Sequence, residues 1–472
     1  MTRHAALIAD LTALCGDRVA TSQAVRDAHG RGEGLSTLHV PDAVVFCQTT
    51  AEVAEVVRRC AAARAPMIPF GTGTSLEGHV AALHGGISLD LSRMDRVLQV
   101  NADDLDCQVE AGCTREALNA HLRDQGLFFP LDPGANASLG GMAATRASGT
   151  NAVRYGTMRE VVLGLTVVTP DGAVIHTGGR ARKSSAGYDL TRLYVGSEGT
   201  LGIITEVRLK LFGIPETIAS AVCQFQTLAG AVQAVALTLQ MGVAVARIEL
   251  LDALMVRACV AYSRLENLAE VPTLFLEFHG SPASVAEQVE TVRDLVGEFG
   301  GGELRWAHST EERSALWKAR HDAWWAARAL APGKEMFSTD ACVPISQLGA
   351  VIEAGVDEAA RLGLVAPVIG HVGDGNFHMF VLHDPADLAE TGRAEELTRA
   401  VARIALAHGG TISGEHGIGT HKLDAMADEH SAAALDVMRR VKRALDPLGI
   451  MNPGKTIPMD CVDRVVDTPP RL

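Results

Sequence analysis

The chain has 472 residues, of which 47% are hydrophobic and 21% are charged, an ordinary balance for a globular protein of two or three domains. A formal net charge of −14 weighs against a nucleic acid or an anionic membrane as partner, because phosphate groups bind clustered cations. The nine cysteines include no C-x-x-C pair, which disfavours an iron–sulfur cluster, a zinc ribbon or a disulfide framework and fits a reducing compartment.

The first 22 residues predict an amphipathic helix, because their short apolar stretch is interrupted by Asp10, which is not the pattern of a signal peptide. No apolar run approaches the roughly 18 residues that suggest a membrane-spanning helix. We therefore expect no transmembrane segment and a cytoplasmic location.

Helix and strand patterns alternate through the first 214 residues. Residues 49–66 begin with a threonine cap, and their apolar residues Val53, Val56, Val57 and Cys60 have helical spacing. The other elements predicted here are a strand at 66–71, a hairpin at 162–179 that turns at Pro170–Gly172, and a strand at 202–212.

The second half of the chain has a different pattern. A strand at 273–280, a helix at 281–300 and a strand at 302–307 follow one another, and a helix at 343–364 comes later. This order is typical of an α+β layer in which helices cover an antiparallel sheet.

The stretch "VIGHVGDGNFHMF" in this half predicts a second hairpin, with residues 373–376 as its loop, because each of them tolerates turn geometry. Val372 then faces Phe377, and His371 faces His378. The two imidazoles form a cross-strand pair on one face, about 5 Å apart at Cβ, which suits one metal ion or one substrate between them. A surface hairpin with two unremarkable histidines is the other interpretation that these residues allow.

Residues 69–79, "PFGTGTSLEGH", follow a predicted strand and are rich in glycine. Gly71, Gly73 and Gly78 do not form the G-x-G-x-x-G pattern of a Rossmann site, and His79 stands where a P-loop needs lysine. The remaining backbone N–H groups can form a nest for an anion such as a diphosphate. An ordinary loop stays the alternative.

Two more segments of this kind follow at 132–160 and 196–207. Glycines and alanines are dense in the first of them, and small residues let a backbone press closely against a large flat ligand. Three such segments before residue 210 predict a large cofactor that lies along this part of the chain.

These three segments resemble the FAD-binding domain, of the PCMH type, of the vanillyl-alcohol-oxidase superfamily. The motifs "HVGDGNFH", "SGEHGIG" and "MNPGK" resemble its C-terminal FAD-linked oxidase domain. The nearest resemblance is to the FAD-linked D-lactate dehydrogenases of the cytochrome type, with glycolate oxidases and D-2-hydroxyglutarate dehydrogenases as relatives, and it covers residues 35 to 458.

The resemblance implies an α+β fold with a two-subdomain FAD-binding domain and a C-terminal substrate domain. The first domain spans 1–214, with its core at about 35–214, and the second spans 215–458. We expect residues 430–458 to pack back toward the FAD domain and residues 459–472 to form a peripheral tail.

The resemblance also assigns FAD contacts by position. Some relatives attach FAD through a histidine in the first loop, where this chain has Thr74, so we expect non-covalent FAD. The residues expected to contact FAD are Phe70, Gly71, Thr72, Gly73, Thr74, Ser75, Pro133, Gly134, Leu139, Gly140, Gly141, Ala144, Ser148, Gly149, Val153, Glu198, Gly199, Ile203 and Asn452.

His371, His378 and Glu415 resemble the family's ligands of a divalent metal, and two imidazoles with one carboxylate suit Zn or Mn. His416 matches the catalytic base. If the segment is extended, the neighbours Glu415 and His416 point apart, one toward the metal and one toward the substrate. A glycine-rich turn with polar tips is the alternative for these two residues.

The chemistry implied is the oxidation of a D-2-hydroxy acid to the 2-oxo acid. The metal polarises the hydroxyl group, His416 takes its proton, and the C2 hydride passes to flavin N5. Arg320 matches the residue that grips the substrate carboxylate, which a guanidinium can do at two points. Trp324 is expected as an apolar wall of the substrate pocket, with core packing as the alternative.

Relatives that act on 2-hydroxyglutarate carry a lysine just before the aspartate that corresponds to Asp340, and Thr339 stands there in this chain. This difference favours a small substrate, D-lactate first, over a dicarboxylate. The alternatives are a glycolate or D-2-hydroxyglutarate dehydrogenase, a non-redox flavoprotein and a metal-dependent hydrolase. The sequence leaves open the acceptor (a cytochrome, a quinone or an electron-transfer flavoprotein), a homodimer, and a peripheral position at the inner face of a membrane.

Overall fold

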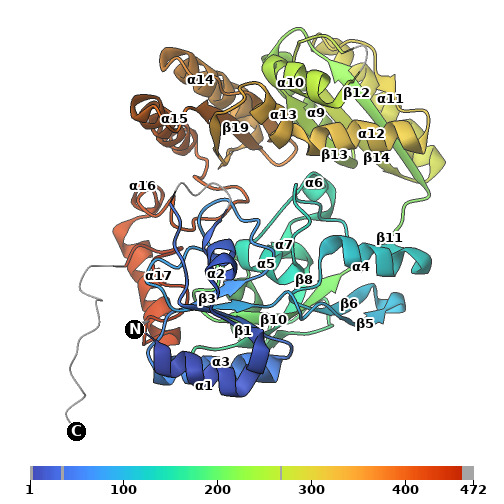
Figure 1. Ribbon diagram of the computed structural model, residues 1–472. Coiled ribbons are helices and arrows are strands. Elements are labelled where there is room, and N and C mark those ends of the chain that lie inside the picture. Colours follow the sequence, from blue (N-terminus) through green and yellow to red (C-terminus); the bar gives the residue numbers. More distant parts are fainter. Residues whose placement is uncertain (1–3, 33–36, 266–267, 460–472) are drawn as a thin grey trace.

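The computed structural model describes residues 4–32, 37–265 and 268–459, which form two lobes (Figure 1). The lower lobe in Figure 1 contains the described residues up to 214 and the C-terminal helices α16 and α17, and the upper lobe contains the chain between them. Of the predicted tail, residues 460–472 lie outside the described residues. In the part of the chain that the structure describes, no helix is both long and apolar enough to cross a membrane.

A four-stranded sheet begins the lower lobe, in the order β1-β2-β4-β3, with β2 and β3 each parallel to β4. The helix predicted at 49–66 is confirmed, and it begins after Thr49, whose side chain accepts a hydrogen bond from the Glu52 backbone N–H. Its four predicted apolar residues are buried. The bounds are β1 Val19–Ala20, β2 Ala43–Phe46, β3 Met67–Phe70, β4 Ile87–Asp90, α1 Ala5–Cys15, α2 Gln23–Gly30 and α3 Thr50–Ala62.

A five-stranded antiparallel sheet completes this lobe, in the order β5-β6-β10-β8-β9, and the predicted hairpin at 162–179 is its β8–β9 pair. The elements here are β5 Val97–Asn101, β6 Asp106–Glu110, β7 Leu127–Phe128, β8 Val162–Val168, β9 Val174–Gly178, β10 Ile203–Lys210, β11 Phe212–Gly213, α4 Arg115–Leu122, α5 Leu139–Thr145, α6 Ala152–Tyr155, α7 Met158–Val161 and α8 Leu190–Tyr194, with 3₁₀ turns at Gly16–Arg18, Ala102–Asp104 and Arg123–Gln125.

The upper lobe is one eight-stranded sheet, whose paired strands run antiparallel in the order β15-β12-β14-β13-β18-β19-β16, with β17 also paired to β19. Helices cover both faces of this sheet. Since side chains alternate between the two faces along a strand, alternate residues of β14 enter different cores. Leu274, Leu276 and Phe278 pack with residues of α9, α11, α14 and α15, whereas Phe275 packs with residues of α10, α12 and α13. The predicted strand–helix–strand at 273–307 is thus β14, α11 and β15.

The bounds in the upper lobe and the C-terminal segment are β12 Thr217–Gln224, β13 Val245–Leu251, β14 Thr273–Gly280, β15 Arg305–Trp306, β16 Glu335–Ser338, β17 Ala341–Cys342, β18 Val368–His371, β19 Asn376–His383, α9 Leu228–Gln240, α10 Ala253–Ser263, α11 Pro282–Glu298, α12 Thr310–His321, α13 Ala323–Ala329, a 3₁₀ turn at Ile345–Gln347, α14 Leu348–Arg361, α15 Leu388–Ala407, α16 Met426–Glu429 and α17 Ala432–Leu445. The helix predicted at 343–364 is therefore shorter, as α14.

The histidine hairpin exists, but its register differs from the prediction by two residues. His371 faces Asn376, and His378 faces Ile369, because the turn begins at Val372 rather than one residue later. A shift of two residues preserves the side-chain face. The imidazole rings of His371 and His378 therefore still lie together, with their centroids 5.6 Å apart.

The chain returns to the lower lobe after α15. Val441 and Leu445 of α17 pack against the core of the five-stranded sheet. The Met67 backbone N–H then donates to the Ile450 carbonyl at 2.8 Å, and the Asn452 N–H donates to the Met67 carbonyl at the same distance. This contact brings the end of the chain to the glycine-rich loop that follows β3.

Candidate active site

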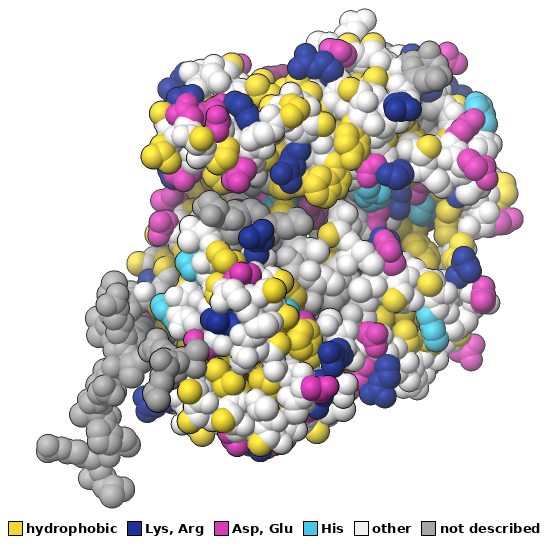
Figure 2. Space-filling view, in the orientation of Figure 1, with side chains coloured by type: hydrophobic (Ala, Val, Ile, Leu, Met, Phe, Trp, Pro, Cys, Tyr) yellow, Lys and Arg dark blue, Asp and Glu magenta, His cyan; other side chains and the backbone are white. Residues whose placement is uncertain are grey.

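A cavity of about 460 Å³ lies between the two lobes. Its lower wall comes from the three glycine-rich segments, and its upper wall from β18, β19, the helices α12 and α13, and residues 415–416. Figure 2 shows a groove between the two lobes on one face of the molecule.

Most of the residues predicted to contact FAD line this cavity, although they come from four separate parts of the chain. Asn452 joins them from the C-terminal segment, where its side chain donates to the Glu198 carbonyl at 2.7 Å. The predicted residues in the cavity wall are Phe70, Gly71, Thr72, Gly73, Thr74, Ser75, Pro133, Gly134, Gly140, Gly141, Ala144, Ser148, Glu198, Gly199 and Asn452.

Four predicted FAD contacts are not part of the wall. Leu139 and Ile203 are fully buried in the lower-lobe cores, because they face away from the neighbouring positions that do reach the cavity. Gly149 lies against the Asp132 backbone, where an added Cβ would come within 2.9 Å of the backbone nitrogen. Val153 packs toward the upper-lobe core instead.

The lower wall has the close backbone packing that a large flat ligand requires. A Cβ added at Gly140 would lie 2.5 Å from the Ala111 Cβ, and one added at Gly71 would collide with the Ser138 hydroxyl. Gly73 has a φ of 71°, which favours glycine. The residues present therefore form a cradle that fits an extended cofactor such as FAD.

Glu198 lies in the cavity wall and also contacts the loop that carries Glu415 and His416. Its buried carboxylate accepts hydrogen bonds from the backbone N–H groups of Ile418 and Gly419, at 2.8 and 2.9 Å. Burial raises the pKa of Glu198, but the nearby His79 and these hydrogen bonds lower it overall. Glu198 therefore connects the lower lobe to the loop that carries Glu415 and His416.

His371, His378 and Glu415 form a compact group in the upper wall. Oε1 of Glu415 lies 3.2 Å from Nε2 of His371 and 3.3 Å from Nε2 of His378. One ligand atom from each residue lies within 4.8 Å of the others. Two imidazole nitrogens and one carboxylate oxygen that converge in this way fit a divalent metal.

The other nitrogen of each imidazole has its own partner. Nδ1 of His371 lies 2.8 Å from Oε1 of Glu249, and Nδ1 of His378 lies 3.0 Å from the Thr339 carbonyl. Burial lowers the pKa of His371, but the Glu249 and Glu415 carboxylates raise it well above its usual value. Both Nε2 atoms are thereby aimed at Glu415, as in metal sites whose ligands are oriented by outer partners.

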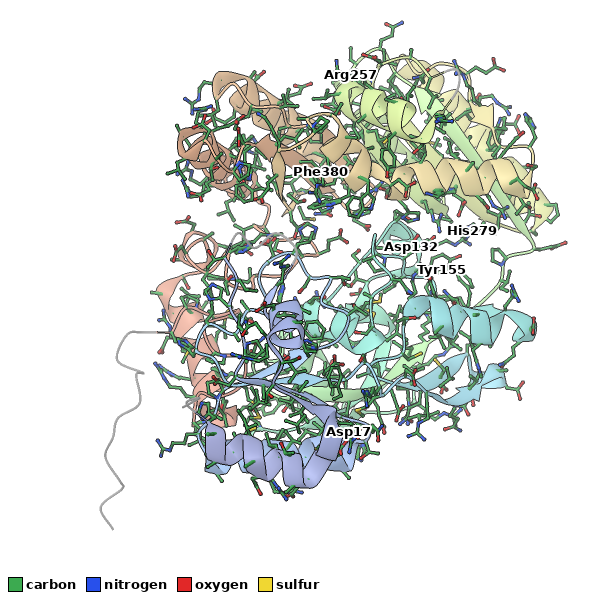
Figure 3. All side chains as sticks on the ribbon, in the orientation of Figure 1. Asp17, Asp132, Tyr155, Arg257, His279 and Phe380 are labelled. Carbon is green, nitrogen blue, oxygen red and sulfur yellow. The ribbon has the colours of Figure 1, made fainter. Side chains whose placement is uncertain are left out.

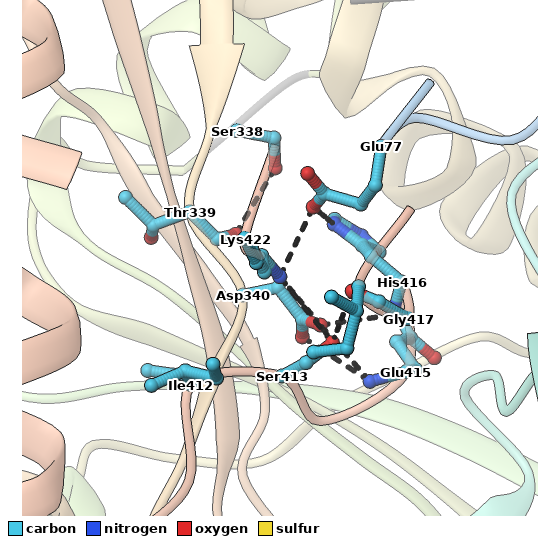
Figure 4. Close-up of polar contacts among 12 residues, drawn as sticks. Glu77, Ser338, Thr339, Asp340, Ile412, Ser413, Glu415, His416, Gly417 and Lys422 are labelled. Carbon is cyan, nitrogen blue, oxygen red and sulfur yellow. Dashed lines mark hydrogen bonds and ion pairs between the residues drawn. The ribbon is translucent and has the colours of Figure 1, made fainter. Parts of the chain in front are cut away.

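Asp340 fixes the Glu415–His416 segment, which is a bend and not extended (Figure 4). Its carboxylate accepts hydrogen bonds from the backbone N–H groups of Glu415 and His416, at 3.1 and 2.8 Å, and from the Ser413 hydroxyl at 2.8 Å. Both side chains reach the cavity, and the His416 ring stacks on His378 with centroids 4.8 Å apart.

Glu77 is a buried carboxylate that the sequence did not indicate. Oε1 of Glu77 lies 3.5 Å from Nδ1 of His416 and 3.0 Å from Nζ of Lys422. Burial raises the pKa of Glu77, but Lys422 and the two nearby histidines hold it well below its usual value. Burial lowers the pKa of His416, and Asp340 and Glu77 raise it overall. Glu77 therefore faces one side of the His416 ring.

Arg320 lines the cavity, but part of its guanidinium already has a partner. Nε of Arg320 donates to Oε2 of Glu249 at 2.9 Å, and Nη2 donates to the same oxygen. Trp324 also lines the cavity, and its ring meets Phe380 edge-on, with centroids 5.4 Å apart. The structure thus brings both predicted substrate contacts to the upper wall beside His371.

Glu249 was missed because its partners are distant in sequence: His371 is 122 residues away. The available signal was a lone carboxylate in the apolar run "VARIELL", since a charge in a buried strand needs a partner. Wall residues that sequence patterns did not indicate also include His79, His321 and Ser338.

Residues 214–456 match the sequence model of the family described as FAD linked oxidases, C-terminal domain, and residues 41–178 match the family described as FAD binding domain. The chain belongs to the FAD-linked oxidase family. The predicted family and the α+β fold class of this FAD-linked oxidase are therefore confirmed, and the chain contains an FAD-binding domain.

Two relatives show high identity over most of their length. A Danio rerio protein named "Probable D-lactate dehydrogenase, mitochondrial" is 50% identical over 455 residues, 96% of this chain and 91% of that protein. An Arabidopsis thaliana "D-lactate dehydrogenase (cytochrome), mitochondrial" is 44% identical, over 96% of this chain and 80% of that protein. A solved p-cresol methylhydroxylase with substrate bound shares the fold, with a TM-score of 0.80, 18% identity and 96% of both chains covered.

The expected cytoplasmic location was wrong. It rested on the apolar pattern of the first 22 residues, whereas both of these sequence relatives are named as mitochondrial proteins.

Proposed function

We propose that this FAD-linked oxidase is a dehydrogenase that converts a D-2-hydroxy acid, D-lactate first, into the 2-oxo acid. One observation carries the proposal: His371, His378 and Glu415 converge beside His416 in the same cavity as the glycine-rich cradle. The names of the two sequence relatives support the choice of D-lactate. We also propose that the chain divides at residue 214, with a substrate domain at 215–458.

FAD is held, in this proposal, by the cradle that includes Gly71, Gly73, Gly140 and Gly141, with Asn452 closing it from the C-terminal side. FAD supplies the redox chemistry when it is bound. The chain itself supplies position and excludes water from the groove between the lobes.

The attachment of FAD is non-covalent in this proposal, because Thr74 replaces the histidine that binds flavin in some relatives. Acid precipitation tests this and should release the yellow colour into the supernatant. His79 is the histidine of this loop that lines the cavity. Colour that stays with the precipitated chain would contradict the proposal, and a His79→Ala variant would then show whether His79 carries the flavin.

His371, His378 and Glu415 would hold a divalent metal, with Zn and Mn as the candidates. When bound, such an ion acts as a Lewis acid toward the substrate hydroxyl. Glu249 and the Thr339 carbonyl keep the imidazoles in position through their Nδ1 atoms.

His416 acts as the base that removes the hydroxyl proton. Its ring lies in the cavity wall, stacked on His378, and Glu77 faces its Nδ1 side, which leaves Nε2 for the substrate. Asp340 fixes the backbone on which the ring is carried. An imidazole whose one nitrogen is oriented by a carboxylate is suited to general-base catalysis through the other nitrogen.

Arg320 orients the substrate carboxylate through Nη1, since Nε and Nη2 are bound to Glu249. Trp324 and Phe380 form an apolar wall that suits a short side chain such as the methyl group of lactate. Ser338 and Thr339 provide no cation for a second carboxylate. This combination favours D-lactate over a dicarboxylate.

The reduced enzyme needs an electron acceptor, and a cytochrome, a quinone and an electron-transfer flavoprotein are the candidates. The Arabidopsis relative has cytochrome in its name. Steady-state turnover with a dye acceptor tests the proposal without the natural acceptor. D-lactate should give pyruvate, and L-lactate should give none. If the enzyme instead oxidised only glycolate or only D-2-hydroxyglutarate, that compound would be assigned as the substrate in place of D-lactate.

A further inference from the structure

A further cavity of about 360 Å³, the side cavity, lies between the lobes next to the candidate active site. Its walls come from α4 and the segment 128–132 on one side, from β12, β13, β14 and α12 on the other, and from Ile214 and Pro215, which precede β12. Phe128, Ile218 and Trp317 make part of the wall apolar. Figure 2 shows Lys or Arg and His side chains in the groove between the lobes, and Figure 3 places Asp132 and His279 at this boundary.

The two carboxylates of the side cavity already have cationic or histidine partners. Oδ2 of Asp132 pairs with Nη2 of Arg247 at 3.0 Å. Oε1 of Glu277 lies 2.9 Å from Nε2 of His279 and 3.5 Å from Nε of Arg247. Arg247 also stacks over the Trp317 ring at 4.6 Å. Arg247 therefore offsets one of the two carboxylate charges, and each carboxylate has at least one close partner.

Two further guanidinium groups in the wall, those of Arg115 and Arg313, have no partner among the carboxylates of the side cavity, as far as the described residues show. Arg313 of α12 makes no side-chain hydrogen bond or ion pair within the described ranges of the chain. Arg115 at the start of α4 pairs only with the exposed Glu116, and its buried Nε has no hydrogen-bond partner among the described residues. The side cavity is thus positive in a chain whose formal net charge is −14.

The side cavity is adjacent to the main cavity, because Asp132 belongs to the walls of both. The same helix connects them: α12 places Arg313 and Trp317 in the side cavity and Arg320 and His321 in the main cavity. His321 lies 3.8 Å from Asp132. Asp132 and His321 thus lie at the boundary between the side cavity and the part of the main cavity that contains Arg320.

We propose that the side cavity is the access site for the carboxylate substrate, which binds there to Arg115 and Arg313 before it passes Asp132 into the main cavity. This inference rests on the proposed function, since it concerns the same substrate. A small 2-hydroxy carboxylate fits the chemistry: its anionic end meets guanidinium groups and its alkyl end meets Trp317. Positive charge at the mouth of a cleft raises the local concentration of an anionic substrate.

The test compares Arg313→Gln, Arg115→Gln and the double variant with wild type in holoenzyme assays with D-lactate and a neutral dye acceptor. The double variant should lower kcat/KM by about tenfold at low salt, because steering by charge changes local concentration by that much or more. The effect should lie in KM, with kcat unchanged, and should shrink as sodium chloride is added. Arg123→Gln is the matched control, because Arg123 is an exposed arginine that follows α4 outside the side cavity.

The outcomes separate the two proposals. A wild type that no 2-hydroxy acid reduces would overturn the proposed function and this inference with it. An active wild type whose double variant stays within twofold of the Arg123→Gln control would overturn the inference alone. A lower kcat with an unchanged KM for D-lactate would also overturn it. So would a lower rate that depends on the concentration of the dye and not on that of D-lactate, because this result would point to the electron acceptor. Ser314→Trp, which fills the side cavity without a change of charge, should also lower kcat/KM.

Discussion

Glu249 orients His371: its Oε1 lies 2.8 Å from the Nδ1 of that histidine, and both side chains are buried. The other carboxylate oxygen accepts from Arg320. One carboxylate from β13 therefore positions both a proposed metal ligand and the proposed substrate-binding arginine.

The first prediction concerns metal affinity. Glu249→Gln keeps the size of the side chain but removes its charge, so His371 loses its strongest partner. Because outer partners of metal ligands typically contribute 10- to 100-fold in affinity, metal should dissociate about that much more readily. Metal content after dialysis against a graded chelator measures this. Glu110→Gln, which changes a buried glutamate that pairs with Arg96 and does not line the cavity, is the control, and equal metal retention in both variants would refute the role of Glu249.

The second prediction concerns the base. His416→Ala should keep FAD and metal but should slow anaerobic flavin reduction about 10²- to 10⁴-fold, the usual contribution of a general base. His383→Ala removes another buried histidine outside the cavity wall and should leave the rate near wild type. Rapid reduction in the His416 variant would show that a different group accepts the proton.

The third prediction concerns the substrate carboxylate. In wild type, two nitrogens of Arg320 donate to Glu249, and Nη1 is the nitrogen proposed to bind the substrate carboxylate. Arg320→Lys replaces this planar group with a single point charge, which cannot make all of these contacts. Loss of charge-assisted hydrogen bonds of about 1.5–3 kcal/mol should lower kcat/KM by roughly 10- to 100-fold. Steady-state kinetics with D-lactate checks this against Arg328→Lys, a variant of a residue outside the cavity wall. Matching values for the two variants would remove Arg320 from the substrate site.

The fourth prediction concerns acid stability. Burial raises the pKa of Glu277, but the hydrogen bond from His279 and the charge of Arg247 lower it to about 2. A carboxyl group with a depressed pKa stabilises the fold above its unfolded value near 4.5, and this stability is lost as the pH falls toward 2. The contribution of Glu277 to the free energy of unfolding is at most about 3 kcal/mol, since one pKa unit corresponds to about 1.4 kcal/mol.

Thermal unfolding of wild type and Glu277→Gln measures this effect. Wild type should be more stable at pH 7, and the difference should narrow as the pH is lowered through 4 to 3. The exposed Glu287→Gln variant should track wild type throughout. A difference between wild type and Glu277→Gln that stays constant with pH would show that the Glu277 charge does not stabilise the fold.

Sequence patterns located the local features well, because these depend on neighbouring residues. The hairpin that carries His371 and His378 follows from its glycine-rich turn, and the error of two residues arose because Asn376 also tolerates a turn. The strand uses Asn376 instead, and Gly375, with a φ of 77°, ends the turn. The two histidines remain on one face because a register shift of two residues, an even number, leaves each side chain on the same face of the sheet.

Contacts between distant segments could not be predicted in this way. Glu77 meets His416, and Glu198 meets Gly419, only because the lobes close on each other, and the second pair is 221 positions apart in the sequence. Neither carboxylate has a local pattern that names its partner. The resemblance to a family supplied positions for the cofactor, but it could not show that the Glu198 carboxylate holds the loop that carries Glu415 and His416.

An anaerobic absorbance spectrum of the purified protein, before and after D-lactate, tests the central claim most directly. The account predicts a yellow flavin band that D-lactate bleaches, while L-lactate leaves it unchanged. A yellow protein that no 2-hydroxy acid bleaches would contradict the proposed dehydrogenase while leaving the FAD-binding fold intact, and it would favour a non-redox flavoprotein. A colourless protein with tightly bound metal would favour a hydrolase at His371, His378 and Glu415.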